Sequence, residues 1–417
     1  MTLTSPARSS RISSASRPLR ALVVSRSYPS ELFPTLGLWV QRPTTLLARD
    51  CDVRVVSPVP WCPPLPSRGP FEQYARFRRV PRSEVVHGVR VERPRFPVGP
   101  GNSTYALEAL AYYRGIVGSV DRLRREWSFD LVHAHFIYPD GVAAARLARR
   151  YGVPLIVTEH APWQPWLDRL GVRRQAVAAA RQSSAILAVS TSVAATIRAE
   201  LGANAPAVSV VPVGVDTGLF APAPAGVRRA DQILFVGFLN FNKGVDVLLH
   251  AMALLRDRGR RCRLLLAGGS FYRKTRQQEE TIRGLTRELG LESAVSFLGH
   301  RPPEEIAQLM RESALVVLPS RAESFGAVLV EALASGTPVV ATRCGGPEDI
   351  VDSSVGVLVP PDDPEALAGA MAGVLDRAEA YAPDALRRHA LERFSWETSV
   401  ARVLDVYRSV AVTGPDR

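Results

Sequence analysis

The chain has little lysine, little cysteine and no long apolar run. Only Lys243 and Lys274 are lysines among 52 basic residues, and the formal net charge is +12. The four cysteines stand singly, so neither a disulfide framework nor a zinc knuckle is indicated. No stretch approaches the roughly 18 apolar residues of a membrane span, and the N-terminus has no apolar segment typical of a signal peptide. We therefore expect a cytoplasmic protein whose residues 1–18 form a disordered Ser/Arg tail.

The basic charge favours an anionic partner, such as a nucleotide, an acidic membrane surface or nucleic acid. Nucleic-acid binding predicts basic residues gathered with aromatic ones on one face, whereas the arginines here are spread along the whole chain. A nucleic-acid-binding protein is therefore only a distant alternative. Because lysine is so rare, a lysine at a particular position needs a functional reason more than an arginine does.

The length of 417 residues favours two domains of roughly 200 residues each. Short runs rich in Val, Ile and Leu alternate with helical patterns, which is typical of parallel strands joined by crossover helices. The sequence thus predicts two successive open α/β sheets. The predicted strands are 21–25, 53–58, 89–94, 131–136, 155–160 and 185–190, then 233–238, 263–269, 295–299, 315–320, 338–343 and 355–360.

These sheets predict an N-terminal domain over residues 19–211 and a C-terminal domain over residues 212–395, with a Pro/Ala/Gly-rich linker at 211–231. Ligands of such sheets bind outside the carboxyl ends of the strands, so two facing sheets make a cleft. Residues 58–84 mix prolines, aromatics and arginines without a period. Long loops are often functional, and we consider an acceptor-binding or membrane-touching surface there, or a plain covering loop.

The stretch PSRAESFGAVLVEALASGTPVVAT, residues 319–342, places Glu331 in a helix that is otherwise apolar on all sides. A carboxylate buried there without partners would take up a proton, so something must hydrogen-bond it. Glu323 lies eight residues earlier, before Ser324-Phe325-Gly326, where the free amides and dipole of a helix start favour an anion. Helical geometry would separate the two carboxylates by roughly 12 Å.

Two carboxylates so placed suit a ligand that is anionic in its middle and rich in hydroxyls at both ends, such as a sugar nucleotide. The alternative is that Glu323 is an ordinary acid at a helix start and that Glu331 pairs with an arginine. A second motif, ILFVGFLNFNKGVDVLLHAMALL at 233–255, places Lys243 at a strand-to-helix turn, where an ammonium can neutralise a phosphate. A solvated surface lysine is the alternative there.

In the first half, Gly37 stands at the start of a predicted helix, where a glycine lets the backbone approach a ligand. His133 and His135 share a face of one strand, and His160 ends another. A zinc site would lack close carboxylate or cysteine ligands, so histidines bonded to the backbone are the plainer interpretation. The metal-type pattern Asp50-Cys51-Asp52 falls at the opposite end of its strand, and we treat it as chance.

Together these residues carry a family resemblance. Glu323-SFGAVLV-Glu331, followed by ALASGTPVVAT, resembles the Glu-x7-Glu motif of the retaining family-4 glycosyltransferases (glycosyl transferases group 1), and the likeness covers roughly residues 20–410. The resemblance implies the GT-B fold, an α/β architecture with two Rossmann-like domains facing across a central cleft. The C-terminal domain would bind the sugar nucleotide, and a helix over residues 396–411 would return to the N-terminal domain.

The resemblance also implies residue roles. Glu323 would contact hydroxyls of the donor sugar, Glu331 the ribose, and Lys243 the diphosphate. The residues expected in catalysis are His160, Glu323 and Lys243. Those expected to bind the donor are Gly37, Gly237, Lys243, Glu323, Ser324, Phe325, Gly326 and Glu331, and the expected acceptor contacts are His135 and Asp140.

The chain departs from the family pattern at one cation. In the family, an arginine follows the glycine that here is Gly237, but this chain has Phe238. One of the two cations that usually neutralise the diphosphate is thus missing from its place, and Arg321 and Arg273 are the candidates to replace it.

The resemblance implies a hexosyltransferase-type enzyme that moves a sugar from a UDP- or GDP-sugar to a hydroxyl acceptor. The expected acceptor is a hydroxyl compound or a lipid-linked sugar, within bacterial cell-surface polysaccharide or glycolipid synthesis. No metal or further cofactor is expected, and a peripheral contact at the inner face of the cell membrane is considered. Another GT-B sugar-nucleotide enzyme, an epimerase or a phosphorylase-like one, is the alternative.

Overall fold

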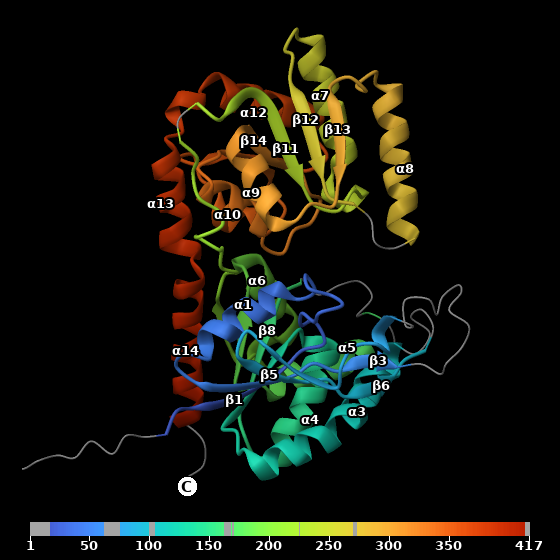
Figure 1. The fold of residues 1–417 in the computed structure, drawn as a ribbon, viewed down its shortest axis with the longest axis vertical. Coiled ribbons are helices and arrows are strands. Elements are labelled where there is room, and N and C mark those ends of the chain that lie inside the picture. The colour runs from blue at the N-terminus through green and yellow to red at the C-terminus, as the bar shows by residue number, and fades with distance from the viewer. Residues whose placement is uncertain are drawn as a thin grey trace, which may run out of the picture.

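The computed structural model describes residues 17–61, 76–99, 105–161, 168, 171–224, 226–269 and 273–412. Residues 1–16 of the predicted tail, and the middle of the 58–84 segment, lie outside these ranges. Figure 1 shows two lobes stacked along the long axis, each built around its own sheet with helices on both sides. Within the described ranges, no helix is long and apolar enough to cross a membrane.

The first lobe contains an eight-stranded sheet in the order β10-β9-β8-β7-β1-β2-β5-β4, in which only the β4–β5 pair is antiparallel. Its central strands are buried along their whole length, as a parallel sheet covered on both faces requires. The strands are β1 (Arg20–Val24), β2 (Asp52–Val56), β4 (Ser83–Val86), β5 (Val89–Glu92), β7 (Leu131–His135), β8 (Leu155–Glu159), β9 (Ala185–Ala188) and β10 (Ala207–Val210). β3 (Val59–Trp61) and β6 (Arg95–Pro97) pair separately.

Helices cover both faces of this sheet (Figure 1). A short π-helical turn, η2 (Ile137–Gly141), follows β7 and leads directly into a helix. The helices are α1 (Leu38–Leu47), α3 (Tyr105–Glu126), α4 (Val142–Tyr151), α5 (Val172–Gln182) and α6 (Thr191–Leu201).

The second lobe contains a fully parallel sheet in the order β13-β12-β11-β14-β15-β16. Counted along the chain this is 3-2-1-4-5-6, the doubly wound Rossmann order, in which ligands bind where the strand order reverses. The strands are β11 (Arg229–Val236), β12 (Arg263–Ala267), β13 (Val295–Gly299), β14 (Ser313–Leu318), β15 (Val339–Thr342) and β16 (Gly356–Val359). The helices are α7 (Val245–Asp257), α8 (Arg273–Glu288), α9 (Pro303–Glu312), α10 (Ala327–Ala334), α11 (Pro347–Ile350), α12 (Pro364–Asp376) and α13 (Pro383–Phe394).

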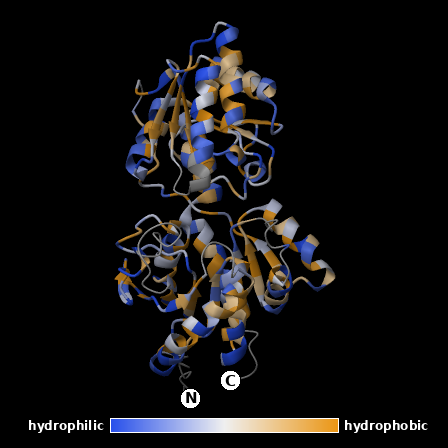
Figure 2. Cartoon of the chain, turned by 90° about the vertical axis from the view of Figure 1, so that its right-hand side faces the viewer, coloured by the Kyte–Doolittle hydropathy of each residue, from blue (hydrophilic) through white to orange (hydrophobic). Residues whose placement is uncertain are grey.

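The last helix, α14 (Trp396–Val412), runs down beside the first lobe (Figure 1). Its apolar side chains, Tyr407 among them, join the core that covers one face of the first sheet. Figure 2 shows the apolar residues concentrated on the strands of both lobes. The C-terminal helix therefore belongs by packing to the N-terminal sheet.

The two lobes touch through polar contacts as well as through the chain that joins them. Asp349 of α11 accepts a hydrogen bond from the backbone N–H of Thr191 at the start of α6, at 2.6 Å. Arg42 of α1 and Asp216 in the linker form an ion pair at 2.5 Å. The predicted linker 211–231 overlaps β11, because that strand begins at Arg229 rather than at residue 233.

Candidate active site

The loop between β14 and α10 carries Glu323. The backbone N–H of Glu323 donates to the Cys344 carbonyl at 3.3 Å, and its own carbonyl accepts from Gly346 N–H at 2.8 Å. A Cβ on Gly346 would stand 2.3 Å from Cα of Phe325, so only glycine allows this approach. The loop is thereby fixed against the segment that follows β15.

Lys243 and Glu323 meet at the carboxyl ends of β11 and β14. Lys243 Nζ lies 2.5 Å from Glu323 Oε2, and both side chains are mostly covered. Lys243 ends the short turn η5 (Phe241–Lys243), and its N–H donates to the Asn240 side chain at 2.9 Å. This is the point at which the strand order of the second sheet reverses, where ligands of such sheets bind.

Helix α10 begins at Ala327, and Gly326 precedes it with a φ of 93°. Glu323 therefore lies in the loop before the helix, so the helical spacing of roughly 12 Å predicted between Glu323 and Glu331 does not apply. Phe325 is buried edge-on against Phe394, with 5.8 Å between ring centroids. The Phe325 side chain therefore packs in the core, and only its backbone atoms are available at the surface of the loop.

Glu331 is partly exposed on α10. Its removal from water raises the pKa of the carboxyl to about 7. Among the residues that the structure describes, none donates a hydrogen bond to this carboxylate or forms an ion pair with it. For that part of the chain, the alternative of an arginine partner is wrong. The carboxylate is open to hydrogen-bond donors from a ligand.

The histidines of β7 and β8 form a connected group. His135 Nδ1 lies 2.9 Å from His160 Nε2, and the two rings are nearly coplanar, end to end, with 5.2 Å between centroids and 18° between their planes. His133 contacts Tyr407 and Thr158 through its two ring nitrogens. Burial lowers the pKa of His133 and of His160 to about 3, so both are neutral near pH 7. No group of three or more metal-ligating side chains occurs among the described residues.

The start of α1 lies beside His160. Trp39 is 37% exposed, and its ring centroid is 6.5 Å from that of His160. The residue before the helix, Gly37, has a φ of 76°, and a Cβ there would stand 2.1 Å from the Ser27 carbonyl oxygen. The predicted close-approach glycine and the predicted catalytic histidine are therefore brought to one end of the first sheet.

The family follows from comparison with known proteins. The model for Glycosyltransferase Family 4 matches residues 44–219, and that for Glycosyl transferases group 1 matches residues 226–388. A D-inositol 3-phosphate glycosyltransferase of Acidothermus cellulolyticus is 32% identical, over 81% of this chain and 80% of the relative. Its counterpart in Saccharomonospora viridis is 34% identical, over 81% and 84%. The chain therefore belongs to the glycosyltransferase family that these two models describe, Glycosyltransferase Family 4 with Glycosyl transferases group 1.

Solved structures show the fold of this glycosyltransferase. Sucrose-phosphate synthase from Thermosynechococcus elongatus superposes with a TM-score of 0.77 at 22% identity, covering 95% of this chain and all (100%) of that one. Anabaena HepE in complex with UDP-glucose gives a TM-score of 0.71 at 22% identity, with 94% and 100% covered. The predicted GT-B fold is confirmed.

One residue of this glycosyltransferase site was not singled out from the sequence. Glu159, directly before His160, accepts the backbone N–H groups of Ile137 and His160 at 2.9 Å each and of Ala161 at 3.0 Å. Burial raises the pKa of its carboxyl to about 7. An acidic residue at the end of a buried strand was the available signal. Glu159 holds the turns that carry His160.

The structure does not place the predicted acceptor contacts on the surface. Asp140 has no exposed surface, and its Oδ1 accepts from Arg26 N–H at 2.6 Å and from the Tyr112 hydroxyl at 2.8 Å. Burial raises the pKa of this carboxyl to about 6. His135 is 4% exposed. In this conformation Asp140 is enclosed by its own domain, whereas His135 lines a small pocket together with His160, so both acceptor contacts stay predictions.

The missing family arginine is not simply replaced. Phe238, at its position, is 43% exposed. Arg321 lies close to the Lys243 turn, but it pairs with both carboxylate oxygens of Asp246 at 2.9 Å and with Asp362 at 2.7 Å. Those two carboxylates neutralise Arg321. The side chain of Arg273 lies outside the described part of the chain.

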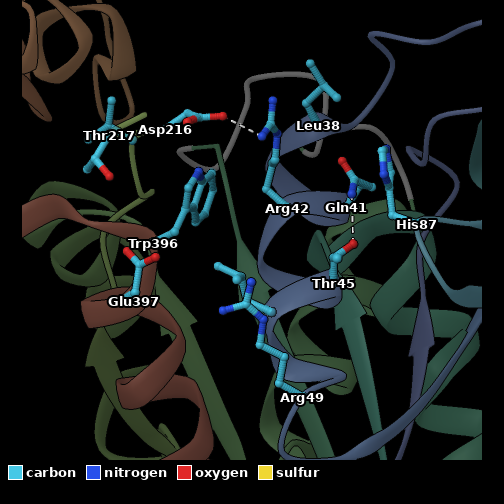
Figure 3. A pocket seen from close by; sticks show the side chains of 12 residues that line it. Leu38, Gln41, Arg42, Thr45, Arg49, His87, Asp216, Thr217, Trp396 and Glu397 are labelled. Atoms are coloured by element: carbon cyan, nitrogen blue, oxygen red, sulfur yellow. Dashed lines mark hydrogen bonds and ion pairs between the residues drawn. The ribbon is translucent and has the colours of Figure 1, made fainter. Parts of the chain in front are cut away.

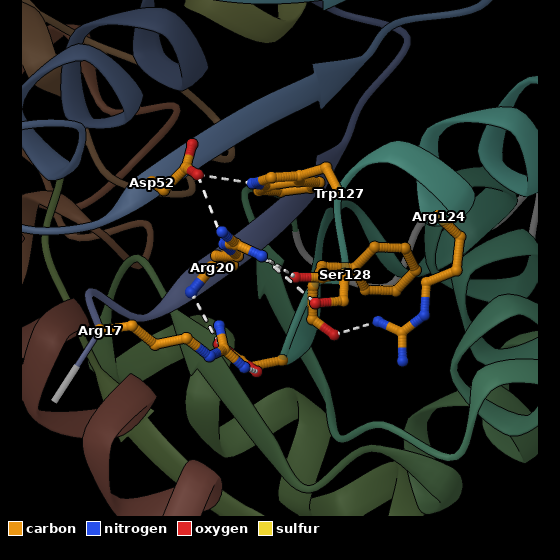
Figure 4. Close-up of polar contacts among 8 residues, drawn as sticks. Arg17, Arg20, Asp52, Arg124, Trp127 and Ser128 are labelled. Atoms are coloured by element: carbon orange, nitrogen blue, oxygen red, sulfur yellow. Dashed lines mark hydrogen bonds and ion pairs between the residues drawn. The ribbon is translucent and has the colours of Figure 1, made fainter.

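The Asp50-Cys51-Asp52 pattern lies at the amino end of β2, away from the histidines. Asp52 accepts from the Trp127 indole N–H at 2.6 Å, and Arg20 Nε lies 3.6 Å from it (Figure 4). Asp52 thus joins the N-terminal ends of the strands to the loop after α3. Asp52 therefore has a structural role, which agrees with the interpretation that the match to a metal-binding pattern is a coincidence.

A cavity of about 350 Å³ lies between α1, α14 and the linker (Figure 3). Arg42, Asp216 and Trp396 are among its lining residues, and the ion pair of the first two crosses it. No predicted site residue lines it. The cavity belongs to the junction of the two lobes.

Proposed function

We propose that this protein is a retaining glycosyltransferase that moves a sugar from a UDP-sugar to a hydroxyl of its acceptor. One observation carries the proposal: the Glu331 carboxylate, with its raised pKa, has no partner among the described protein groups. Ribose hydroxyls donating to it would favour the charged form and offset its loss of hydration. The Glu-x7-Glu resemblance assigns that ribose contact to Glu331.

The other groups of the donor, its sugar and its diphosphate, are assigned to the remaining site residues. Glu323 would accept hydroxyls of the donor sugar, while Lys243 and the free amides at the start of α10 would face the diphosphate. Negative charge develops on the departing diphosphate, so cations and amides fixed toward it are the main physical source of rate. His160, neutral and beside the start of α1, would donate to or accept from the donor at the sugar side.

By family resemblance, the acceptor oxygen attacks the anomeric carbon on the face from which the diphosphate leaves, and that phosphate takes the proton. No carboxylate pair is proposed for a double displacement. Lys243 supplies positive charge in the place where other transferases use a metal, so we propose metal-independent transfer. Closure of the two lobes would exclude water and limit hydrolysis of the donor.

The base and the acceptor are proposed from the relatives. HepE was solved with UDP-glucose, and the relatives at 32% and 34% identity are named for D-inositol 3-phosphate. We propose a uridine base, with a polyol phosphate or a lipid-linked sugar as acceptor. These relatives are transferases, which favours sugar transfer over epimerisation; a phosphorylase-like reaction would differ in using inorganic phosphate as acceptor.

A role in cell-surface polysaccharide or glycolipid synthesis, at the inner face of the membrane, is part of this proposal. The exposed arginines next to β4, together with Trp61 at 43% exposure, support contact with an anionic surface. These arginines are Arg76, Arg78, Arg79 and Arg82.

The test is a thermal-shift titration with UDP, GDP and ADP, each with and without magnesium. We expect UDP to stabilise the wild type without metal and Glu331→Ala to lose most of that shift, since a ligand stabilises the state that it binds. Glu288→Ala, an exposed acid at the end of α8, is the matched control and should keep the full shift. If no nucleotide shifts the melting temperature of the wild type, the proposed donor site is wrong.

A further inference from the structure

A chain of side chains runs from the C-terminal helix to His160. The Tyr407 hydroxyl of α14 lies 2.7 Å from His133 Nδ1, and His133 Nε2 lies 2.7 Å from Thr158 Oγ1. The His133 ring packs on His135 with 4.6 Å between centroids. His135 Nδ1 then lies 2.9 Å from His160 Nε2. Helix α14 is thus linked through β7 and β8 to the histidine of the proposed site.

Burial sets the direction of the first hydrogen bonds. Tyr407 is fully buried, and His133 is its hydroxyl's one hydrogen-bond partner among the described residues. The phenol must therefore donate to His133 Nδ1, or a buried O–H would stay unsatisfied. A neutral imidazole has one N–H, so we assign it to His133 Nε2, which donates to Thr158 Oγ1. Thr158 in turn lines a small cavity of about 40 Å³ shared with His160, into which its hydroxyl hydrogen can point.

The ring of His160 is held from several sides. His135 lies end to end with it and occupies its Nε2, so Nδ1 is the ring nitrogen left for a ligand. Phe136 packs against it with 5.0 Å between centroids, and Trp39 closes another side. The φ of Phe136 is 70°, a costly conformation for a non-glycine residue and one that is enriched at active sites. A shift of His135 would turn Nδ1 of His160.

We propose that Tyr407 and His135 are positioning residues for His160. Tyr407 fixes the orientation of His133, His135 packs on that ring, and the hydrogen bond between His135 and His160 aims Nδ1 of His160 toward the donor. The inference rests on the proposed function, in which His160 contacts the donor. Tyr407 itself is 0% exposed and touches no ligand, so its effect is transmitted through the two histidine rings.

The test compares Tyr407→Phe, His135→Phe and His135→Asn, with UDP release from UDP-glucose in the presence of D-inositol 3-phosphate as acceptor for the assay. We expect kcat to fall about tenfold in both phenylalanine variants while the KM for UDP-glucose changes less than about twofold, since orientation rather than binding is lost. His135→Asn should restore part of kcat, because the asparagine amide can replace Nδ1 in this hydrogen bond, as a donor through Nδ2 or as an acceptor through Oδ1. Tyr151→Phe is the matched control: its hydroxyl bonds Asp121 at 2.6 Å, at the far end of α4, and its kcat should stay at the wild-type value.

A second readout does not depend on turnover. In protein labelled with ¹⁵N-histidine, the ring signals of His160, assigned with His160→Gln, should shift in Tyr407→Phe and stay in place in Tyr151→Phe. Wild-type kcat together with unshifted His160 signals in Tyr407→Phe would overturn the proposal. If the wild type releases no UDP, the proposed function fails at this donor, and the histidine signals still decide the positioning. If Tyr407→Phe does not fold, the His135 variants alone test the proposal. A kcat equal to the wild-type value in both His135→Phe and His135→Asn would then overturn it.

Discussion

The side chains of Lys243 and Glu323 are joined by an ion pair of 2.5 Å across 80 positions of the sequence. One comes from the turn after β11 and the other from the loop after β14. A donor that places a phosphate near the ammonium and a hydroxyl near the carboxylate would exchange this pair for two new contacts. The pair therefore keeps both groups in place and hydrogen-bonded while no donor is bound.

Loss of the ammonium should weaken binding of the diphosphate selectively. In Lys243→Met we expect UDP to bind at least about tenfold more weakly, because one charge-assisted contact to phosphate is worth roughly 1.5–3 kcal/mol. Uridine, which has no phosphate, should bind equally to both proteins. Isothermal titration with UDP, UMP and uridine measures this.

Arg301→Met is the control for a lost cation, because Arg301 forms an exposed pair with Glu305 one helical turn away. It should bind UDP as the wild type does. Equal weakening of UDP and uridine in Lys243→Met would mean that the lysine holds the loop rather than the phosphate.

The raised pKa of Glu331 predicts a pH dependence of stability. Its folded pKa of about 7 exceeds the ordinary 4.5, so the folded protein holds a proton that the unfolded chain releases between these pH values. The carboxyl therefore lowers the free energy of unfolding as pH rises from 4.5 to 7. Glu331→Gln cannot titrate, so it should match the wild type near pH 4.5 and exceed it at pH 8 by on the order of 1–3 kcal/mol.

Denaturant unfolding of both proteins from pH 4.5 to 8 measures this difference. Glu159 and Asp140 have pKa values raised to about 7 and about 6, but they titrate in both proteins and cancel in the comparison. Hydroxyls that donate to Glu331 favour its charged form, so UDP should stabilise the wild type more at pH 7.5 than at pH 5.5. A stability difference that does not change with pH would show that the pKa of Glu331 is not raised in the folded protein.

The fold was largely predictable from the sequence. All twelve predicted strands occur, because fully buried parallel strands are continuous Val, Ile, Leu and Ala runs that stand out from their surroundings. The strands that were not predicted are short or at edges: β4 alternates between exposed and half-buried residues, β10 at the other edge has no fully buried residue, and β3 and β6 have three residues each. Such segments owe their structure to the neighbours on which they pair rather than to their own pattern.

The site was predictable where a residue was conspicuous by type. Lys243 is one of two lysines, and Glu331 interrupts an apolar helix. The enclosure of Asp140 was not predictable, because it depends on Arg26 and Tyr112, which reach it from other elements. The His135–His160 hydrogen bond likewise arises from the pairing of β7 with β8, which the sequence does not state.

The backbone at the start of α1 should tolerate only glycine. In Gly37→Ala, a Cβ would stand 2.1 Å from the Ser27 carbonyl oxygen at a φ of 76°, so we expect a loss of at least about 2 kcal/mol in the free energy of unfolding. Gly118→Ala is the control, since Gly118 lies on the exposed face of α3 with open space around its Cβ position. That change should stabilise by about 0.5–1 kcal/mol. Urea denaturation measures both changes. A free energy of unfolding that is the same in Gly37→Ala and in the wild type would mean that the loop at Ser27 can move away from the added methyl group.

The contact between Asp349 and Thr191 should control the closure of the two lobes. Asp349 accepts from the backbone N–H of Thr191 at 2.6 Å and from its hydroxyl, so a carboxylate on α11 of the second lobe binds the first N–H of α6, beside the N-cap Ser190. Asp363 also accepts an N–H at a helix start, from Ala366 at 2.9 Å, but as the N-cap of its own helix and within one lobe. We therefore expect Asp349→Ala and Asp363→Ala to lose a similar stability of about 1 kcal/mol each.

The two variants should differ in shape. Without this contact between lobes, Asp349→Ala should have a larger radius of gyration in small-angle X-ray scattering than the wild type, whereas Asp363→Ala should keep the wild-type value. Since closure brings the first lobe to the donor, Asp349→Ala should also raise the KM for the donor more than Asp363→Ala does. Identical scattering from both variants would mean that the lobes are held together by their other contacts, such as the Arg42–Asp216 pair, and that the contact on α6 stabilises only its helix.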